Sequence, residues 1–212
     1  MADVLEQQNH TRRVMTTEAY DKAATIVEPG PLVMVADSSF SPGIIGLVAS
    51  RLVEKFNRPA VVVGIDGEIS RGSCRTIPEF DIGSALHRVA GEMEGFIRYG
   101  GHPQAAGFTI TTASLPELRR RLTALADTLL GATPPGPQLD IDLDTSLRDL
   151  PRNIYKTIQS LEPFGAGNRP PVFMSRNVQP AKVRHMGTNG DHLRLQLRDR
   201  GMTWSAVAFR LG

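Results

Sequence analysis

The chain has 212 residues, which is enough for one core of ordinary size and a smaller second unit. A hydrophobic fraction of 41% and a charged fraction of 22% are typical of a folded globular protein and exclude a mostly disordered chain. The net charge of +2 is close to neutral, so affinity for nucleic acid requires a local basic patch.

The single cysteine, Cys74, excludes an internal disulfide, and no apolar run reaches the roughly 18 residues of a membrane span. The N-terminus has no apolar segment of the kind that directs secretion. We therefore expect a cytoplasmic protein with no membrane partner.

Residues 1–30 predict a linker helix that ends before Pro29 and Gly30. An apolar run at 31–37 predicts a buried strand, and the apolar spacing of 44–56 predicts a helix, with Ser41 as its cap and Pro42 as its first residue. A second apolar run at 60–64 completes a strand–helix–strand unit. Its crossover predicts parallel pairing of the two strands.

The next segments predict a strand at 68–77, a helix at 81–93, a strand at 107–111 and a helix that ends near Leu130. Ser114 and Glu117 have the spacing of a capping box at the start of that last helix. Residues 31–130 therefore predict an α/β domain with a mixed sheet.

Glycine and proline at 131–138 predict an interdomain linker, and 139–212 predict a second domain. That domain begins with a strand at 139–144 and a short helix near 150–161, and it ends in three strands joined by tight turns. A small OB-like barrel fits this pattern. Because such a barrel needs five strands, we expect it to be incomplete.

Strand period places Arg71, Ser73 and Arg75 on one face of the strand at 68–77. Two guanidinium groups beside a hydroxyl suit a phosphate or a carboxylate, because arginine offers paired planar donors. An exposed face with solvated arginines would give the same pattern, and this segment alone leaves both interpretations open.

The segment "YGGHPQAAG" surrounds His102 with small residues. Gly100 and Gly101 permit a close approach of the backbone to a ligand, and their amides can line a concavity. The alternative is a tight helix–strand packing site in which His102 is a hydrogen-bonded core group.

The longer pattern G-G-H-x-x-A-A-G followed by an apolar strand resembles the signature of the DHH-associated domain of DHH-family phosphoesterases. Four further segments follow the order and spacing of RecJ-type single-strand-specific exonucleases: "SPGIIGLVASRLVEKFNRPAVVVG", "RGSCRTIPEFDIGSAL", "LEPFGAGNRPPVF" and "HLRLQLRD…WSAVAF". The chain therefore resembles this family over nearly its whole length. The resemblance implies a DHH-associated domain at 31–130 and an OB-like nucleic-acid-binding domain at 139–212.

The resemblance also implies how the site is used. In such enzymes the DHH-associated domain binds the phosphate end of single-stranded DNA, and a preceding DHH domain carries out hydrolysis with manganese or magnesium. Carried over by position, the terminal-phosphate and substrate contacts are Ser73, Arg75, Gly100, Gly101 and His102. One departure is Ser41, where RecJ-like sequences usually have a histidine.

The DHH triplet and its carboxylates are absent from these 212 residues, and the five histidines are scattered along the chain. A two-metal site needs several convergent carboxylates. We therefore expect no catalytic residue and no metal site in this chain, and a DHH catalytic domain as a required partner.

In the second domain, Phe164 can stack on a base, while Asn168 and Arg169 are further candidates for nucleic-acid contacts. Arg184 and Arg194 lie on predicted strands, where they fit either a nucleic-acid surface or a solvated face. We expect Trp204 to belong to the core.

The sequence thus favours the substrate-binding portion of a 5′-to-3′ single-stranded-DNA exonuclease, inactive alone. A complete, non-catalytic nucleic-acid-binding module and a small-substrate phosphoesterase of the nanoRNase or exopolyphosphatase type remain as alternatives. Preference for DNA over RNA and docking of a single-strand-binding protein stay open.

Overall fold

A computed structural model describes residues 2–131, 136 and 138–212. The chain divides into two compact units, 1–137 and 138–212, and each is described by itself. Most of the linker that the sequence predicts at 131–138 lies outside the described residues.

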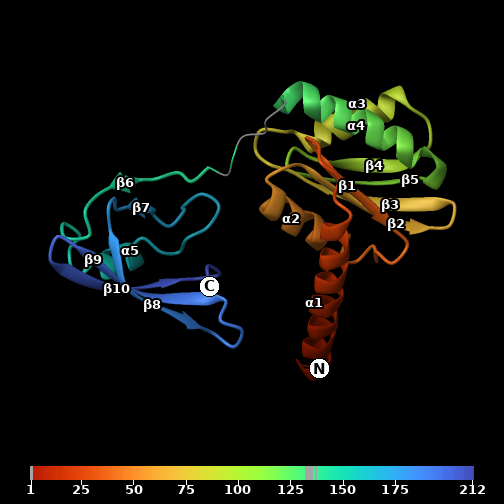
Figure 1. Cartoon of the computed structure of the whole chain (residues 1–212). Helices are drawn as coiled ribbons and strands as arrows, with labels where there is room; N and C mark the ends of the chain where they lie inside the picture. The colour runs from red at the N-terminus through yellow and green to blue at the C-terminus, as the bar shows by residue number, and fades with distance from the viewer. Residues whose placement is uncertain (1, 132–135, 137) are drawn as a thin grey trace. The chain divides into compact units, whose positions relative to one another are not determined.

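The first unit is built on a five-stranded mixed sheet (Figure 1). The strand order is β1-β2-β3-β5-β4, with β1 and β2 parallel and every other pair antiparallel. The parallel pair confirms the predicted crossover. The strands are β1 (Val33–Asp37), β2 (Ala60–Asp66), β3 (Ile69–Arg75), β4 (Phe96–His102) and β5 (Ala105–Thr111).

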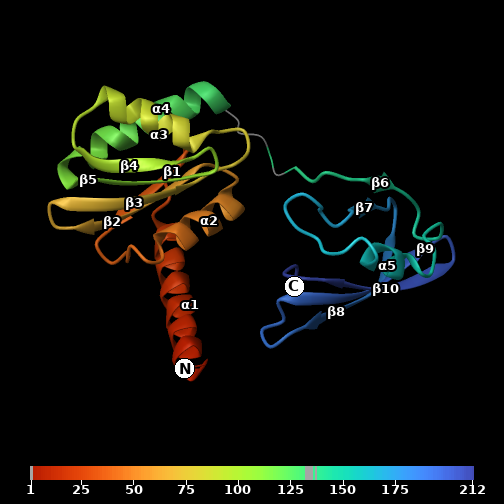
Figure 2. The ribbon, with the colours of Figure 1, turned by 180° about the vertical axis from the view of Figure 1, so that it is seen from behind.

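Helices cover the two faces of this sheet unequally (Figures 1 and 2). Two helices, α3 (Ile82–Glu92) and α4 (Leu115–Leu130), pack on one face. On the other face α2 (Ile45–Phe56) packs against β2 and β3 and shares an apolar core with β1, and α1 (Ala2–Thr25) packs on α2. A short 3-10 helix, η1 (Thr112–Ser114), leads into α4.

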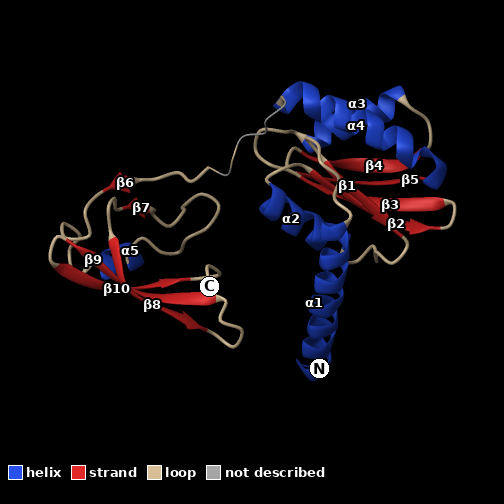
Figure 3. Ribbon diagram, in the orientation of Figure 1, coloured by secondary structure: helices blue, strands red, loops and turns tan. Residues whose placement is uncertain are grey.

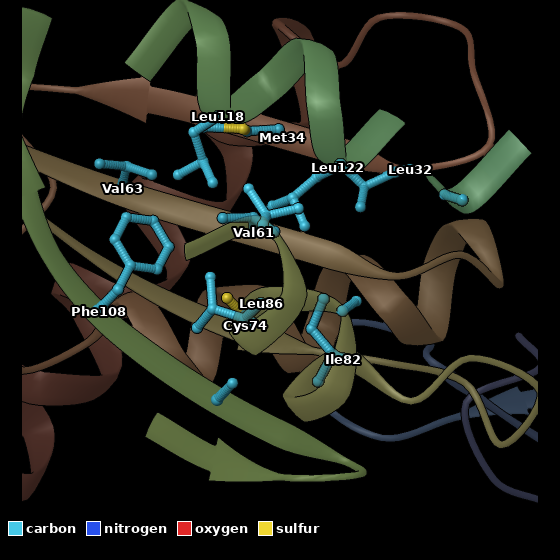
Figure 4. Packing of buried hydrophobic residues seen from close by; sticks show 14 of the residues in the cluster. Leu32, Met34, Val61, Val63, Cys74, Ile82, Leu86, Phe108, Leu118 and Leu122 are labelled. Carbon is cyan, nitrogen blue, oxygen red and sulfur yellow. The ribbon is translucent and has the colours of Figure 1, made fainter. Parts of the chain in front are cut away.

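Alternation along the strands divides the apolar side chains between two cores. In β2, Val61 and Val63 join the core under α3 and α4, while Ala60 and Val62 join the core under α2. Figure 4 shows the first of these cores, in which Phe108 of β5 lies among leucines of α3 and α4. Each side of the sheet is therefore stabilised by its own apolar cluster.

Two predicted helix caps are wrong, although α4 does begin directly after Ser114. The helix α2 begins at Ile45, and Ser41 contributes its main-chain carbonyl, which accepts from the N–H groups of Ile44 and Ile45, rather than a side-chain cap. At α4 the Ser114 hydroxyl bonds to the hydroxyl of Thr111, and Glu117 pairs with neighbouring arginines, so no capping box forms. At α4 other partners therefore take both side chains that the local pattern assigns to the capping box.

The prediction of a single strand after the glycine motif is also incomplete. The motif itself lies in the edge strand β4, which forms a hairpin with β5. Glycine disfavours strands by intrinsic propensity, and here the ladder to β5 overrides that preference.

The second unit is a small β region (Figure 3). Its main sheet is an antiparallel meander of β8 (Gln179–Met186), β9 (His192–Asp199) and β10 (Met202–Ala208), as the turn pattern predicts. The predicted strand at 139–144 is reduced to β6 (Leu143–Asp144), which pairs with β7 (Phe173–Met174), and the predicted helix to α5 (Ile154–Gln159).

Alternation along the meander separates an apolar from a polar face. Leu195, Leu197 and Trp204 lie on the apolar face, where Trp204 is half-buried and is not part of a fully buried core. At the end of β9 the buried Asp199 accepts a hydrogen bond of 2.6 Å from the Ser146 hydroxyl. This bond ties the meander to the segment that follows β6.

Candidate nucleic-acid interface

The candidate site lies on β3, β4 and β5, on the sheet face that α2 covers only in part. The core under α2 contains side chains of β1 and β2 but none of β3, β4 or β5. In these three strands every second side chain points into the core under α3 and α4. The side chains between them therefore lie on the face of the sheet that carries α2. They form what we call the open face: Arg71, Ser73, Arg75, Arg98, Gly100, His102, Ala105, Gly107 and Thr109.

The strand register arranges the open face in three rows. Arg75, Ala105 and His102 are neighbours across β3, β5 and β4. The next row is Ser73, Gly107 and Gly100, and the third is Arg71, Thr109 and Arg98. Rows on one face are two residues apart, or about 7 Å. The structure therefore brings His102 into line with Arg75, although 26 residues separate them in the chain.

Ser73 and Arg75 lie beneath the first turn of α2. The Arg75 guanidinium donates to the Ser73 hydroxyl over 3.2 Å and to the Cys74 carbonyl over 2.7 Å. A Cβ at Gly46 would come within 3.0 Å of Arg75 Nη2 and 3.1 Å of Ser73 Oγ. The N–H groups of Ile44 and Ile45 are already bonded to the Ser41 carbonyl, and those of Leu47 and Val48 to the Ile44 carbonyl, so this turn adds its partial positive charge rather than a set of free donors. A guanidinium and a hydroxyl thus converge beneath the first turn of α2, which is an arrangement suited to an anion.

Gly46 was not among the residues predicted from the sequence. Its signal is a glycine in the first turn of an amphipathic helix, where it lowers helix stability by about 1 kcal/mol relative to alanine. Such a residue indicates a close contact, and here that contact is with Arg75 and Ser73.

The two glycines of the motif have different surroundings. A Cβ at Gly100 would meet nothing within 4 Å, whereas one at Gly101 would lie 2.5 Å from the Ala105 carbonyl oxygen and 2.5 Å from the Ala106 Cα. Gly101 is thus required for packing inside the hairpin. Gly100 leaves free space on the open face, beside the exposed His102.

On its other side the motif is fixed against α3. The Ile82 N–H donates to the Pro103 carbonyl over 3.0 Å, and a Cβ at Gly83 would clash with the His102 carbonyl at 2.7 Å. A shallow pocket of about 640 Å³ lies along this edge, lined by residues of α3 and by Tyr99, Gly100, Gly101 and His102. The backbone of the motif is therefore held by α3 while the His102 side chain stays exposed.

The open face is cationic. Among the described residues, Arg71, Arg75 and Arg98 form no ion pair with a carboxylate. The arginines of α4, by contrast, pair with Glu117, Glu92 and Glu28. Three arginines without a carboxylate partner among the described residues therefore lie together on the open face.

In the second unit, Asn168 and Arg169, which the sequence suggests as nucleic-acid contacts, bond to other residues of the same unit. The Asn168 side-chain amide donates to the carbonyls of Leu161 and Pro163, at 2.7 and 3.1 Å, and Arg169 forms an exposed ion pair of 3.6 Å with Asp140. Phe164 is half-buried. These contacts give Asn168 a structural role in the described loop.

Arg184 and Arg194 are direct cross-strand partners on β8 and β9. Like charges opposite one another destabilise a sheet unless an anion lies between them. The register adds further polar residues to the same face and no acidic residue. We call this the basic meander face, and it contains Lys182, Arg184, Arg194, Gln196, Arg198, Thr203, Ser205 and Val207.

Manganese or magnesium ions require a cluster of ligands. Across residues 2–131, 136 and 138–212 there is no group of three or more His, Cys, Asp or Glu side chains that could hold a metal ion. The residues present therefore do not fit a divalent metal centre of the two-ion kind. No described helix has the length and apolarity needed to cross a membrane.

Comparison with known families gives two matches. Residues 29–128 match the DHHA1 domain, and residues 141–212 match the RecJ OB domain. The open face lies in the first match, and the basic meander face lies in the second.

Known relatives agree with both matches. The single-stranded-DNA-specific exonuclease RecJ of Bacillus subtilis is 34% identical over all of this chain, and that of Thermus thermophilus is 31% identical over 81% of it. The crystal structure of Thermus thermophilus RecJ in complex with Mg²⁺ superposes on 99% of the chain with a TM-score of 0.77 at 28% identity. A crystal structure of exonuclease RecJ bound to manganese covers 58% of the chain with a TM-score of 0.52 at 30% identity.

The chain spans only part of these proteins: 27% of the Bacillus subtilis relative, 24% of the Thermus thermophilus relative and 32% of the Mg²⁺ complex. The order of the two matched domains is the same along the chain as in the sequence prediction. The chain belongs to the RecJ family and consists of a DHHA1 domain followed by a RecJ OB domain.

Proposed function

We propose that this chain is the substrate-binding portion of a 5′-to-3′ single-stranded-DNA exonuclease that acts in DNA repair and recombination. The observation that carries the proposal is the open face, on which Ser73 and Arg75 lie beneath the N-terminus of α2 and in line with Gly100 and His102. These groups bind the 5′-terminal phosphate. The free space above Gly100 receives the first part of the DNA backbone.

The basic meander face is a second surface that binds single-stranded DNA. Its cations have no carboxylate partner among the described residues, and a phosphate between Arg184 and Arg194 relieves their mutual repulsion. Contacts of this kind are independent of base sequence and weaken with salt. The OB domain therefore adds affinity without selecting a sequence.

Hydrolysis itself belongs to a DHH domain that holds manganese or magnesium, because the described residues of this chain offer no ligand cluster for these ions. The chain alone binds single-stranded DNA and does not cleave it. This separates the proposal from a small-substrate phosphoesterase, for which the chain itself would have to release product.

The test is fluorescence anisotropy of this chain with a 5′-phosphorylated oligothymidine and with its 5′-hydroxyl form, over a salt series. Manganese is present and product release is followed. We expect tighter binding of the phosphorylated form and no cleavage. In Arg75→Ala the preference for the phosphorylated form should fall by about 10- to 100-fold, since a hydrogen bond to a charged group contributes about 1.5–3 kcal/mol.

The matched control is Arg120→Ala, which removes an exposed arginine that pairs with Glu117 on α4. This variant should bind like the unmodified chain. Equal binding of the two oligonucleotides by the unmodified chain, or an intact preference in Arg75→Ala, would contradict the terminal-phosphate site. Cleavage would assign the reaction to this chain and contradict a purely binding role.

A further inference from the structure

The third row of the open face contains two arginines that the terminal-phosphate site does not use. Arg71 of β3 and Arg98 of β4 both lie opposite Thr109 of the intervening strand β5. Both are exposed, and neither forms a hydrogen bond or an ion pair among the described residues. Two free guanidinium groups therefore flank one hydroxyl on the same surface as Ser73 and Arg75.

The direction of Arg98 follows from its neighbour. Tyr99 pairs with the core residue Phe108, and its ring lies 5.7 Å from that of His87 of α3, so it points to the α3 face. The adjacent Arg98 therefore points to the opposite, open face. The bulge between Phe96 and Arg98 sets this register, because Phe96 and Tyr99 both have their rings on the α3 side.

The distance along the sheet leaves room for a second phosphate. Arg71 and Arg75 are four residues apart on β3, which corresponds to about 13 Å. The row between them consists of Ser73, Gly107 and Gly100, and a Cβ at Gly100 would meet nothing. A single strand can therefore cross this row close to the backbone of the sheet.

We propose that Arg98 and Arg71 form a second subsite, which binds an internal phosphate of the same strand whose 5′-terminal phosphate lies at Ser73 and Arg75. This inference rests on the proposed function. The ligand is a phosphodiester of single-stranded nucleic acid, which arginine recognises by paired planar donors. The subsite reads no base, so it contributes affinity equally for all sequences.

The test separates the two subsites by their readouts. Binding of 5′-phosphorylated and 5′-hydroxyl oligothymidine is measured over a salt series for the unmodified chain, Arg98→Ala and Arg75→Ala. The logarithm of the association constant decreases linearly with the logarithm of the salt concentration. In Arg98→Ala this negative slope should become less steep by about 0.7, the value for one phosphate contact on a single strand. Affinity should drop about 10-fold for both oligonucleotides, and the preference for a 5′-phosphate should stay unchanged.

Two further variants sharpen the result. Arg98→Lys keeps the charge and should restore the salt slope, and Arg120→Ala on α4 should change neither the slope nor the affinity. Circular dichroism checks the fold, which we expect to be intact because Arg98 is exposed and unpaired in the described structure.

An unchanged salt slope in Arg98→Ala would overturn the second subsite, as would a loss confined to the 5′-phosphate preference or an absence of DNA binding by the chain at low salt. Failure of the proposed function has a different signature: Arg75→Ala keeps the preference while Arg98→Ala still lowers the slope. The failures of the two proposals can therefore be told apart.

Discussion

Gly100 and Gly101 are adjacent in β4 but face opposite sides of the sheet: Gly100 opens onto empty space, and Gly101 packs against the Ala106 backbone. A methyl group at position 101 would lie 2.5 Å from the Ala106 Cα, whereas at position 100 it would touch no protein atom. The first glycine of the motif is thus dispensable for packing, and the second is required for it.

This difference predicts opposite results for two alanine substitutions. Gly101→Ala should destabilise the first unit by about 1–3 kcal/mol, because the backbone of β5 has to move. Gly100→Ala should leave stability unchanged or raise it by up to about 1 kcal/mol, while weakening binding of a 5′-phosphorylated oligonucleotide. Urea unfolding and anisotropy on the same preparations measure both effects. Normal DNA binding by Gly100→Ala and Gly100→Val would show that the space above Gly100 is not used.

Gly46 predicts a second separation of stability from binding. Gly46→Ala should keep or raise the stability of the first unit, because alanine favours a helix by about 0.5–1 kcal/mol. Its Cβ displaces Arg75 Nη2 and Ser73 Oγ, so the preference for a 5′-phosphate should fall several-fold. Gly91→Ala is the control, since a Cβ there meets nothing within 4 Å. If both variants bind equally well, the contact beneath α2 does not shape the phosphate site.

Because Arg184 and Arg194 are cross-strand partners, removing one of them should make the second unit more stable and should weaken its binding of single-stranded DNA. Arg194→Gln removes one of two directly opposed like charges and should stabilise the unit by a few tenths to about 1 kcal/mol at low salt. The same change should weaken single-stranded-DNA binding and reduce its salt dependence. Lys156→Gln on the exposed α5 controls for net charge. A loss of stability in Arg194→Gln would mean that the arginine is held by contacts other than a bound anion.

The pair Lys22 and Asp37 predicts a pH dependence of unfolding. The Lys22 ammonium, 2.7 Å away, and then the hydroxyl and N–H of Ser39 lower the pKa of Asp37 from 3.8 to about 2. Because the folded pKa lies below the unfolded one, the stabilisation is complete above about pH 4 and is lost as the pH falls toward 2. It is reduced by salt, since both side chains are partly exposed.

Urea unfolding between pH 7 and pH 2 checks this expectation. The difference in free energy of unfolding between the unmodified chain and Asp37→Asn should be constant above pH 4 and should shrink below it. Glu94→Gln, which changes an exposed carboxylate with no hydrogen bond or ion pair among the described residues, should show a smaller change with pH. A difference that stays constant down to pH 2 would mean that the ion pair does not form in solution.

Local patterns were sufficient for much of the first unit. The alternation of β3 places Arg71, Ser73 and Arg75 on one face, and the apolar runs of β1 and β2 with the helix between them predict the parallel pair. These features depend on residues close together in the chain. The family resemblance rested on such segments and was confirmed by the matches to the DHHA1 and RecJ OB domains.

Features that depend on distant contacts were missed. The strand β4 contains two glycines, so its sequence does not predict a strand, and its pairing with β5 is needed to identify it. The alignment of His102 with Arg75 requires β5, which is later in the chain than β4, to lie between β4 and β3. The position of Gly46 beside Arg75 depends on how α2 crosses the sheet. Sequence alone therefore named several residues of the open face but not their neighbours.

The hydroxyls of Ser41 and Ser114 show the limit of capping patterns. Both residues stand where a helix start needs an acceptor, yet the Ser114 hydroxyl bonds to Thr111 and Ser41 offers its main-chain carbonyl. Thr111 is only three residues from Ser114, so the side chain of a capping residue can bond to another nearby group instead of the helix N–H groups.

Strand alternation in β3 and β5 has a consequence for how this domain can change. Ser70, Gly72 and Cys74 of β3 and Ala106, Phe108 and Ile110 of β5 are buried, while the residues between them line the open face. Substitutions on the open face therefore leave the packing beneath α3 and α4 untouched. The same scaffold can acquire a different anion specificity by exchanging a few outward-facing side chains, which makes the sheet a suitable host for engineered phosphate or carboxylate recognition.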